Sequence, residues 1–443
     1  MKKLLSLCLC TSLSLSFALQ ADEKLMTASK KPIKNVIMIV GDGMGPAFTT
    51  AYRYYNDDPN TPEIEETVFD RHLVGLNSTY PAPISGYVTD SAAGATALAT
   101  GIKSYNGAIS VDVDKKPLKT VLQHAKTLGK KTGVVVTSQV NHATPASYIT
   151  HNESRRNYDA IADSYIDNGI NIDLLLGGGT KYFIREDRNL VEEFKEKGFQ
   201  YVDNYEQLTS IKKEEPLLGL FAPVGLPWSL DDSNKHRLSE MTKIATEQLE
   251  NKNGYFMLIE ASQVDWAGHS NDIASAMAEM DDLAKTLIYL EQYVEQNPDT
   301  LVVLTADHST GGLTLGSDGE YKWQPSVFKG MTQSISAIAQ FIAEKEFTAE
   351  QLATMLTFAL TDEQLSQLHS IKQDESEKIT KPQLTRQLYK KLNQFVSAKS
   401  FTGWTTGGHT GIDVPVFAFG KGFEKFQNKT DNTDIAKIIF TIL

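Results

Sequence analysis

The sequence predicts an α/β fold with a largely parallel central sheet that is covered by helices on both faces. Six short apolar runs rich in β-branched residues indicate strands, at residues 36–40, 133–137, 172–176, 255–259, 301–305 and 414–419. These runs are continuous rather than alternating, which is typical of strands buried on both faces. Helix-like stretches separate them, at residues 118–128, 157–167, 238–251 and 273–296. Helical crossovers between buried strands favour parallel pairing.

Length and composition narrow the class of protein. The chain has 443 residues, of which 41% are hydrophobic and 22% are charged, as expected of a folded globular protein. Its formal net charge of −12 argues against a surface that binds nucleic acid by neutralising phosphates.

The first 21 residues are interpreted as a secretory signal peptide. Lys2 and Lys3 precede a short apolar run that ends in small residues. A lipoprotein signal at Cys10 is the alternative, although the small residue expected before that cysteine is lacking. We expect a periplasmic or secreted protein without a membrane span, because no later apolar run is long enough. Since Cys8 and Cys10 both lie in this segment, the mature chain should form no disulfide.

The remaining chain, residues 22–443, is predicted to be a single domain with a helical insertion at 331–399. This insertion has no strand-like run, and it contains two sequence patterns of helix capping boxes. They are Thr348 with Gln351 and Thr361 with Gln364.

Polar residues follow four of the predicted strands where each strand ends. They are Asp42 after the first run, His142 and Thr144 after the second, Glu260 after the fourth, and Asp307 and His308 after the fifth. Each alone is compatible with a turn, a cap or a structural hydrogen bond. Their recurrence is better explained by one site, because ligands bind outside the carboxyl ends of parallel strands.

Further candidate ligands lie in two other segments. Asp265 and His269 in "EASQVDWAGH" are four residues apart, which places them on one helical face suited to one metal ion. An exposed ion pair is the alternative. His409 lies in the glycine-rich segment "TTGGHTGID". Imidazoles with carboxylates favour zinc, whereas carboxylates with a threonine hydroxyl suit magnesium.

Ser91 in "VTDSAAGATA" is either a helix cap or a nucleophile. We expect it at or beside the first turn of a helix that begins near Ala92. The free amides and the positive dipole end there favour an anion, so the two roles are compatible.

Seven motifs, in this order between residues 41 and 420, resemble those of the alkaline phosphatase family. They are "GDGMG", "TDSAAGATA", "HATPASY", "HNESRRNY", "EASQVDWAGH", "TADHSTGG" and "GGHTG". The resemblance implies an alkaline-phosphatase-like fold and hydrolysis of small phosphate monoesters through a phosphoserine intermediate. It also implies two Zn²⁺ and one Mg²⁺ per chain, and a homodimer.

The resemblance further implies roles for single residues. Ser91 would be the nucleophile and Arg155 would bind the phosphate, with Arg156 the competing choice. The implied ligands are Asp265, His269 and His409 for the first zinc, Asp42, Asp307 and His308 for the second, and Asp42, Thr144 and Glu260 for magnesium.

Two positions depart from the best-known bacterial pattern. His142 replaces an aspartate, and it would either coordinate the third ion or lie behind it. The resemblance therefore leaves open which ion that site holds. Trp266 replaces a lysine and removes a cation near bound phosphate. Weaker retention of the product would follow, and simple packing is the alternative role.

Two rival functions are weaker. A diesterase or sulfatase of the same superfamily would use similar metals, but the sulfatase motif C/S-x-P-x-R is absent because Ala92 and Ala93 follow Ser91. A non-catalytic periplasmic metal-binding protein would need neither Ser91 nor Arg155.

Overall fold

The computed structural model describes residues 32–373 and 379–443. The predicted signal peptide, with Cys8 and Cys10, lies outside these residues. Within the described part of the chain, no helix combines the length and the apolar character needed to cross a membrane.

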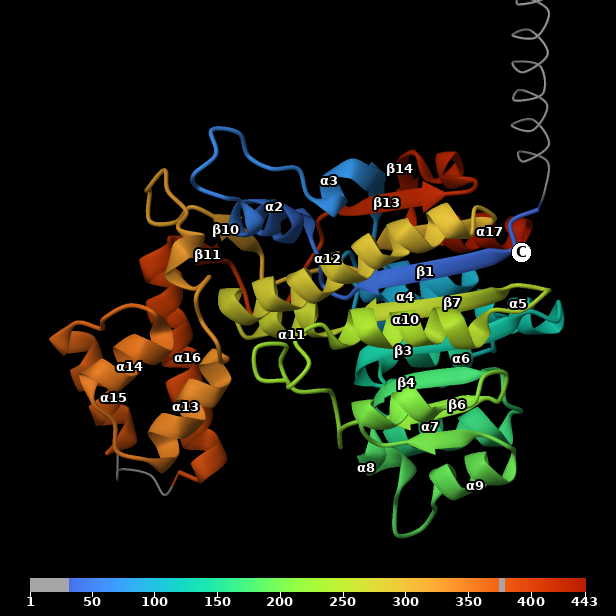
Figure 1. The fold of residues 1–443 in the computed structure, drawn as a ribbon, viewed down its shortest axis with the longest axis horizontal. Helices are drawn as coiled ribbons and strands as arrows, with labels where there is room; N and C mark the ends of the chain where they lie inside the picture. The colour runs from blue at the N-terminus through green and yellow to red at the C-terminus, as the bar shows by residue number, and fades with distance from the viewer. Residues whose placement is uncertain (1–31, 374–378) are drawn as a thin grey trace, which may run out of the picture.

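A ten-stranded sheet forms the centre of the protein (Figure 1), in the order β14-β2-β13-β8-β1-β7-β3-β4-β6-β5. Its strands are β1 (Asn35–Gly41), β2 (Leu73–Ser78), β3 (Lys131–Gln139), β4 (Leu174–Gly178), β5 (Gln200–Val202), β6 (Leu217–Leu220), β7 (Tyr255–Ala261), β8 (Thr300–Thr305), β13 (Val414–Gly420) and β14 (Asn428–Asp431). Strand β13 is antiparallel to both of its neighbours, and all other pairs are parallel. The predicted largely parallel sheet is confirmed.

All six predicted strands are present, with ends shifted by at most a few residues. Strands β2, β5, β6 and β14 were not predicted, because they are short or partly exposed. Two small antiparallel pairs lie outside the main sheet. They are β9 (Ser309–Thr310) with β12 (His409–Thr410), and β10 (Leu313–Leu315) with β11 (Thr402–Trp404).

Helices cover both faces of the sheet. The α-helices of the described residues, some of which lie away from the sheet, are α2 (Pro46–Asn56), α3 (Val68–His72), α4 (Ser91–Thr100), α5 (Val121–Thr127), α6 (Ala143–Ile149), α7 (Tyr158–Asp167), α8 (Thr180–Phe183), α9 (Leu190–Glu196), α10 (Arg237–Leu249), α11 (Gln263–His269), α12 (Ile273–Gln296), α13 (Ile335–Glu344), α14 (Ala349–Leu356), α15 (Asp362–Lys372), α16 (Lys381–Ser400) and α17 (Asn432–Ile442). The predicted helix at 273–296 coincides with α12.

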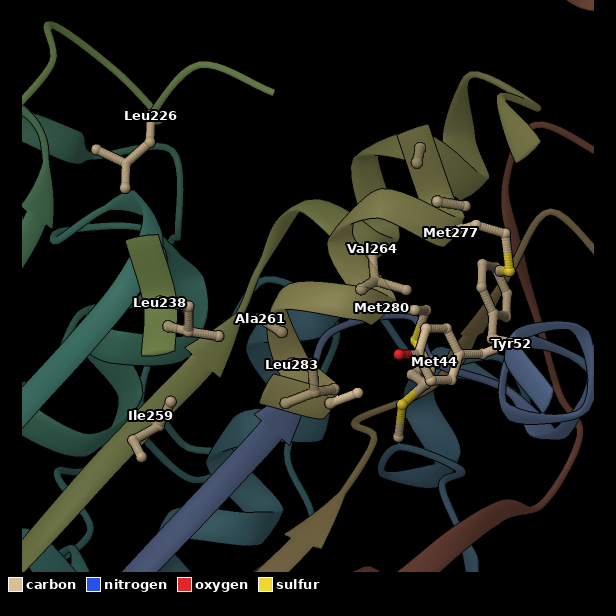
Figure 2. Close-up of a cluster of buried hydrophobic side chains, with 14 of the residues drawn as sticks. Met44, Tyr52, Leu226, Leu238, Ile259, Ala261, Val264, Met277, Met280 and Leu283 are labelled. Atoms are coloured by element: carbon tan, nitrogen blue, oxygen red, sulfur yellow. The ribbon is translucent and has the colours of Figure 1, made fainter. Parts of the chain in front are cut away.

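Alternate residues of the central strand β1 face two different apolar layers. Ile37 and Ile39 belong to the cluster beneath α10 and α12, whereas Met38 and Val40 belong to the cluster on the opposite face. Figure 2 shows the first layer, where Leu283 of α12 lies close to Ala261 at the end of β7. The continuous apolar runs of the sequence are therefore explained by burial on both faces.

The predicted helical region 331–399 contains α13, α14, α15 and most of α16, and its described residues form no strand. Both predicted capping boxes are present, at Thr348 with Gln351 and at Thr361 with Gln364. Figure 1 shows these helices as a group at the left of the view, beyond β11. The description of this region as an insertion in a single domain stays a prediction.

Candidate active site

The polar residues predicted to meet at one sheet edge follow four adjacent strands, β8, β1, β7 and β3. The register aligns their carboxyl ends, since Val40 pairs with Glu260 on one side and with Thr305 on the other. The side chains of Asp42, Glu260 and Asp307 have no exposed surface. Four strands thus deliver polar groups, among them three carboxylates, to one buried place.

Three groups of side chains place their ligand atoms within 4.8 Å of one another. They are Asp42 with Asp307 and His308, Asp265 with His308 and His409, and Asp42 with His142 and Glu260. The first group matches the predicted second zinc set. His269 lies beside the second group, with its Nε2 atom 3.4 Å from Asp265 Oδ2. His308 belongs to both the first and the second group and so lies between them. The sequence did not indicate this shared position.

The hydrogen bonds of His269 and His409 fix their tautomers. His269 Nδ1 lies 2.7 Å from the Gly407 carbonyl oxygen, and His409 Nδ1 lies 2.9 Å from that of Thr89. A carbonyl oxygen only accepts, so each Nδ1 atom carries the hydrogen and each Nε2 atom of a neutral ring presents a lone pair. These two Nε2 atoms are 3.1 Å apart. Two facing lone pairs beside a carboxylate fit a cation, and the carbonyl contact is the usual support of a metal-binding histidine.

His308 is oriented in the same way. The Thr310 hydroxyl donates to Asp265 Oδ1 at 2.5 Å, so its oxygen is free to accept from His308 Nδ1 at 3.2 Å. The His308 Nε2 atom then faces Ser91 Oγ at 3.0 Å and Asp307 Oδ2 at 3.2 Å. Burial lowers the pKa of His308 well below its ordinary value, so the ring stays neutral.

Several oxygen atoms of this site are buried and have no hydrogen-bond partner. They are both carboxylate oxygens of Asp42, Asp307 Oδ2, Glu260 Oε1 and Thr144 Oγ1. Burial, and then repulsion between neighbouring carboxylates, raises the pKa values of Asp42 and Asp307. Buried negative charge without a partner is costly. The donor set therefore fits divalent cations.

Ser91 is the first residue of α4, and the preceding Asp90 is its N-cap. Asp90 Oδ1 accepts hydrogen bonds from the backbone amides of Ala93 and Gly107, both at 3.0 Å. The expectation that Ser91 lies in the first turn is met, but the capping belongs to Asp90. A Cβ atom at Gly94 would lie 2.9 Å from the Asp307 carbonyl oxygen, so glycine lets this helix approach the site.

Arg155, rather than Arg156, is the arginine whose side chain reaches the site around Ser91. Its Nη1 atom donates to Asp90 Oδ2 at 3.1 Å, and its Nη2 atom donates to His142 Nε2 at 3.3 Å. Arg156 is exposed. Burial, with the nearby positive charge of Arg155, lowers the pKa of His142 to about 3, so His142 is neutral.

Trp266 lies on the His142 side of the site. The two rings meet edge to face, with their centroids 6.0 Å apart. The indole is half-buried, and it forms a wall beside the group of Asp42, His142 and Glu260.

Sequence reasoning missed the residues that orient the ligands. Ser262 and Ser138 donate hydrogen bonds to Glu260 Oε2 at 2.6 and 3.2 Å, and Thr310 links Asp265 to His308. The carbonyl oxygens of Thr89 and Gly407 leave no trace in a sequence. Only Asp90 carried a signal, since an aspartate before a run of small helix-forming residues is a common N-cap.

The fold and this site together define a metal-binding α/β hydrolase. The family model for alkaline phosphatase matches residues 33–443. "Alkaline phosphatase 3" of Bacillus subtilis (strain 168) is 42% identical, with 100% of this chain and 97% of that protein covered. "Repressible alkaline phosphatase" of Saccharomyces cerevisiae is 32% identical, with 95% and 82% covered.

Among solved structures, the cold-active alkaline phosphatase from the psychrophile Shewanella sp. is 49% identical and superposes with a TM-score of 0.87. The match covers 92% of this chain and 99% of that one. The chain belongs to the alkaline phosphatase family, and it is a phosphomonoester hydrolase.

Proposed function

We propose that this protein hydrolyses small phosphate monoesters to an alcohol and inorganic phosphate through a phosphoserine formed on Ser91. The observation that carries the proposal is the position of Ser91 Oγ. It lies at the start of α4, 3.0 Å from His308 Nε2, and Arg155 is held nearby by the capping aspartate of the same helix.

The proposed ions are two Zn²⁺ and one Mg²⁺ per chain. Zinc would be held by Asp265, His269 and His409 in one site and by Asp42, Asp307 and His308 in the other, and magnesium by Asp42, Thr144 and Glu260. The three imidazole lone pairs favour zinc, and the all-oxygen third set favours magnesium. When bound, these ions would stabilise the negative charge on the entering and leaving oxygens during phosphoryl transfer.

The protein's own groups bind and orient the ester. Free amides in the first turn of α4 and the positive end of its dipole would attract the phosphate. The planar guanidinium of Arg155 would donate two hydrogen bonds to non-bridging oxygens, which a lysine cannot do in the same geometry. Asp90 limits the positions open to that guanidinium.

The chemistry then proceeds in two displacements at phosphorus. Ser91 Oγ forms a bond to phosphorus as the ester's P–O bond breaks, and the alcohol leaves with a proton. Water then attacks the phosphoserine from the opposite side, which releases inorganic phosphate and returns the hydrogen to Ser91. The roles of His142 and Trp266 are to border the phosphate on one side.

The proposal is tested by comparing a chromogenic phosphate monoester with its diester at alkaline pH, before and after a chelator. We expect monoester turnover that the chelator abolishes and that zinc with magnesium restores. Comparable diester turnover would favour a phosphodiesterase. No turnover with both metals restored would favour a metal-binding protein without catalysis. Metal analysis of the active protein would decide which ion the third site holds beside His142.

We also propose that residues 1–21 direct export to the periplasm or the medium and that the mature protein is a homodimer. The charged and apolar pattern of the N-terminal segment supports export, and resemblance to the family supports the dimer. N-terminal sequencing of exported protein and its mass by light scattering test both. A retained leader, or the mass of one chain, would contradict the respective proposal.

A further inference from the structure

The loop at residues 222–227, which follows β6, is hydrogen-bonded to the rest of the protein near both of its ends. At its start, the Ala222 carbonyl oxygen accepts hydrogen bonds from the amides of Gly179 and Thr180, at 2.8 and 3.1 Å. The Pro223 carbonyl oxygen accepts from the Lys181 amide at 3.1 Å. These bonds attach the first half of the loop to the end of β4 and the start of α8.

The second half is attached to β3 and to α11. The Leu226 amide donates to the Thr137 carbonyl oxygen at 2.9 Å, and the Leu226 carbonyl oxygen accepts from Gln263 Nε2 at 2.6 Å. The Leu226 side chain is buried in the same apolar cluster as Leu238 and Ile259, and Figure 2 shows it on the loop at the edge of that cluster. Gln263 is the first residue of α11, the helix that also carries Asp265, His269 and Trp266.

A buried arginine completes the attachment. Arg237 has no exposed surface, and it pairs with Glu279 at 2.8 Å and Asp282 at 3.1 Å. Its Nη2 atom also donates to the Pro227 carbonyl oxygen at 3.1 Å and to Gln263 Oε1 at 3.3 Å. The loop and the start of α11 are thus held by the Arg237 guanidinium in a low-dielectric interior. Loss of a hydrogen-bond partner costs more free energy there than in water.

Gly225 is the point at which this fixed loop meets the active site. A Cβ atom built on Gly225 would lie 2.4 Å from both Cη2 and Cζ3 of Trp266. Ordinary carbon contacts are about 3.5 Å or longer, so the indole would have to move by about 1 Å. The backbone of Gly225 is not in the left-handed region. The residue is therefore required for space and not for its conformation.

We propose that loop 222–227 is a rigid wall that positions the Trp266 indole beside His142, and that Gly225 is the residue that determines this position. Because the indole borders the place proposed for phosphate, its position sets how tightly inorganic phosphate is held. This second step rests on the proposed function. Gly225 acts only through Trp266 and touches no reacting atom, so it is a positioning residue.

The test is a double-mutant cycle of Gly225→Ala with Trp266→Phe, in the metal-loaded enzyme. Gly225→Ala is expected to change the inhibition constant of inorganic phosphate by at least about threefold. A change of this size is near the lower limit of the interaction energies found between contacting residues. We expect kcat to stay within about twofold. On the Trp266→Phe background, whose smaller ring leaves room, the same substitution should change inhibition less than about 1.5-fold.

Two further measurements separate positioning from general damage. Gly330→Ala is the matched control, because Gly330 also lacks a left-handed backbone and its nearest neighbour would be Thr357 Cγ2 at 3.5 Å; it should leave phosphate inhibition unchanged. Tryptophan emission should shift in Gly225→Ala and should show no shift between the Trp266→Phe variants with and without it.

The proposal is wrong if Gly225→Ala behaves as the wild type, or if it has the same effect with and without the indole. A wild-type chain that hydrolyses no monoester would overturn the proposed function instead. The emission comparison would then still decide whether the loop positions Trp266.

Discussion

Asp90 connects the helix of the nucleophile to the arginine, so its replacement is expected to disturb both stability and phosphate binding. One carboxylate oxygen accepts from the amides of Ala93 and Gly107, and the other accepts from Arg155. Asp90→Ala removes all three bonds. Loss of an N-cap costs about 1 kcal/mol, an amide left without its partner about 1 kcal/mol more, and a partly exposed ion pair at most about 1 kcal/mol.

We therefore expect Asp90→Ala to lower the free energy of unfolding by about 2–3 kcal/mol, as measured by urea unfolding of the metal-loaded enzyme. Asp90→Asn separates the two roles. Its amide oxygen still caps α4, since asparagine caps as well as aspartate, but it has no charge with which to orient Arg155. Its stability should stay within about 1 kcal/mol of the wild type.

Both variants should weaken inhibition by inorganic phosphate, because an unrestrained guanidinium loses entropy when it binds the ligand. A cost of about 1 kcal/mol corresponds to roughly fivefold. Wild-type phosphate inhibition in both variants would refute the orienting role of Asp90. An Asp90→Asn variant as unstable as Asp90→Ala would refute the assignment of the stability to capping.

Three further outcomes follow from the structure. Removal of metal should lower the free energy of unfolding by on the order of 4 kcal/mol per site, relative to protein at a metal concentration a thousandfold above Kd, because Asp42 and Asp307 then lack a counter-charge; unchanged urea midpoints would contradict this. Trp266→Lys should tighten phosphate inhibition by up to about fivefold, as a partly exposed ion pair allows. An unchanged inhibition constant would speak against a position of residue 266 beside the bound phosphate. The hydrogen bond to Asp281 raises the pKa of His236. The protonated histidine therefore stabilises the fold fully below about pH 6.5, and this stabilisation is lost as the pH rises through the raised pKa. Relative to the wild type, His236→Gln should thus be less stable near pH 6 and equally stable near pH 10, and a deficit that persists at the higher pH would exclude this titration.

The central part of the fold was predictable because its strands are buried on both faces. Their apolar runs are continuous, and helices fill the intervals, so parallel order followed from the chain itself. Strand β14 was not predictable, since its residues "NKTD" have no apolar pattern and are ordered by pairing with β2. Strand β5 has three residues, too few for any periodicity.

The residues predicted at strand ends, among them Asp42, Glu260 and Asp307, come together at one sheet edge, as expected of parallel strands. The position of His308 between two groups could not be predicted, because it depends on how β9 and β12 pair beside the sheet. The tautomers of His269 and His409 depend on backbone carbonyl oxygens, which every residue has. Gly225 resembles any loop glycine in the sequence, and only its contact with Trp266 shows why it is needed.

Trapping of the phosphoenzyme decides whether Ser91 is the nucleophile. The enzyme is mixed with a phosphate monoester, quenched in acid and digested, and the phosphorylated peptide is sequenced by mass spectrometry. We predict phosphate on Ser91 and none in Ser91→Ala. That variant should also keep its stability within about 1.5 kcal/mol, because Asp90 caps α4 and the serine hydroxyl makes one hydrogen bond, to His308. Phosphate on another residue, or undiminished turnover by Ser91→Ala, would show that Ser91 is not the nucleophile.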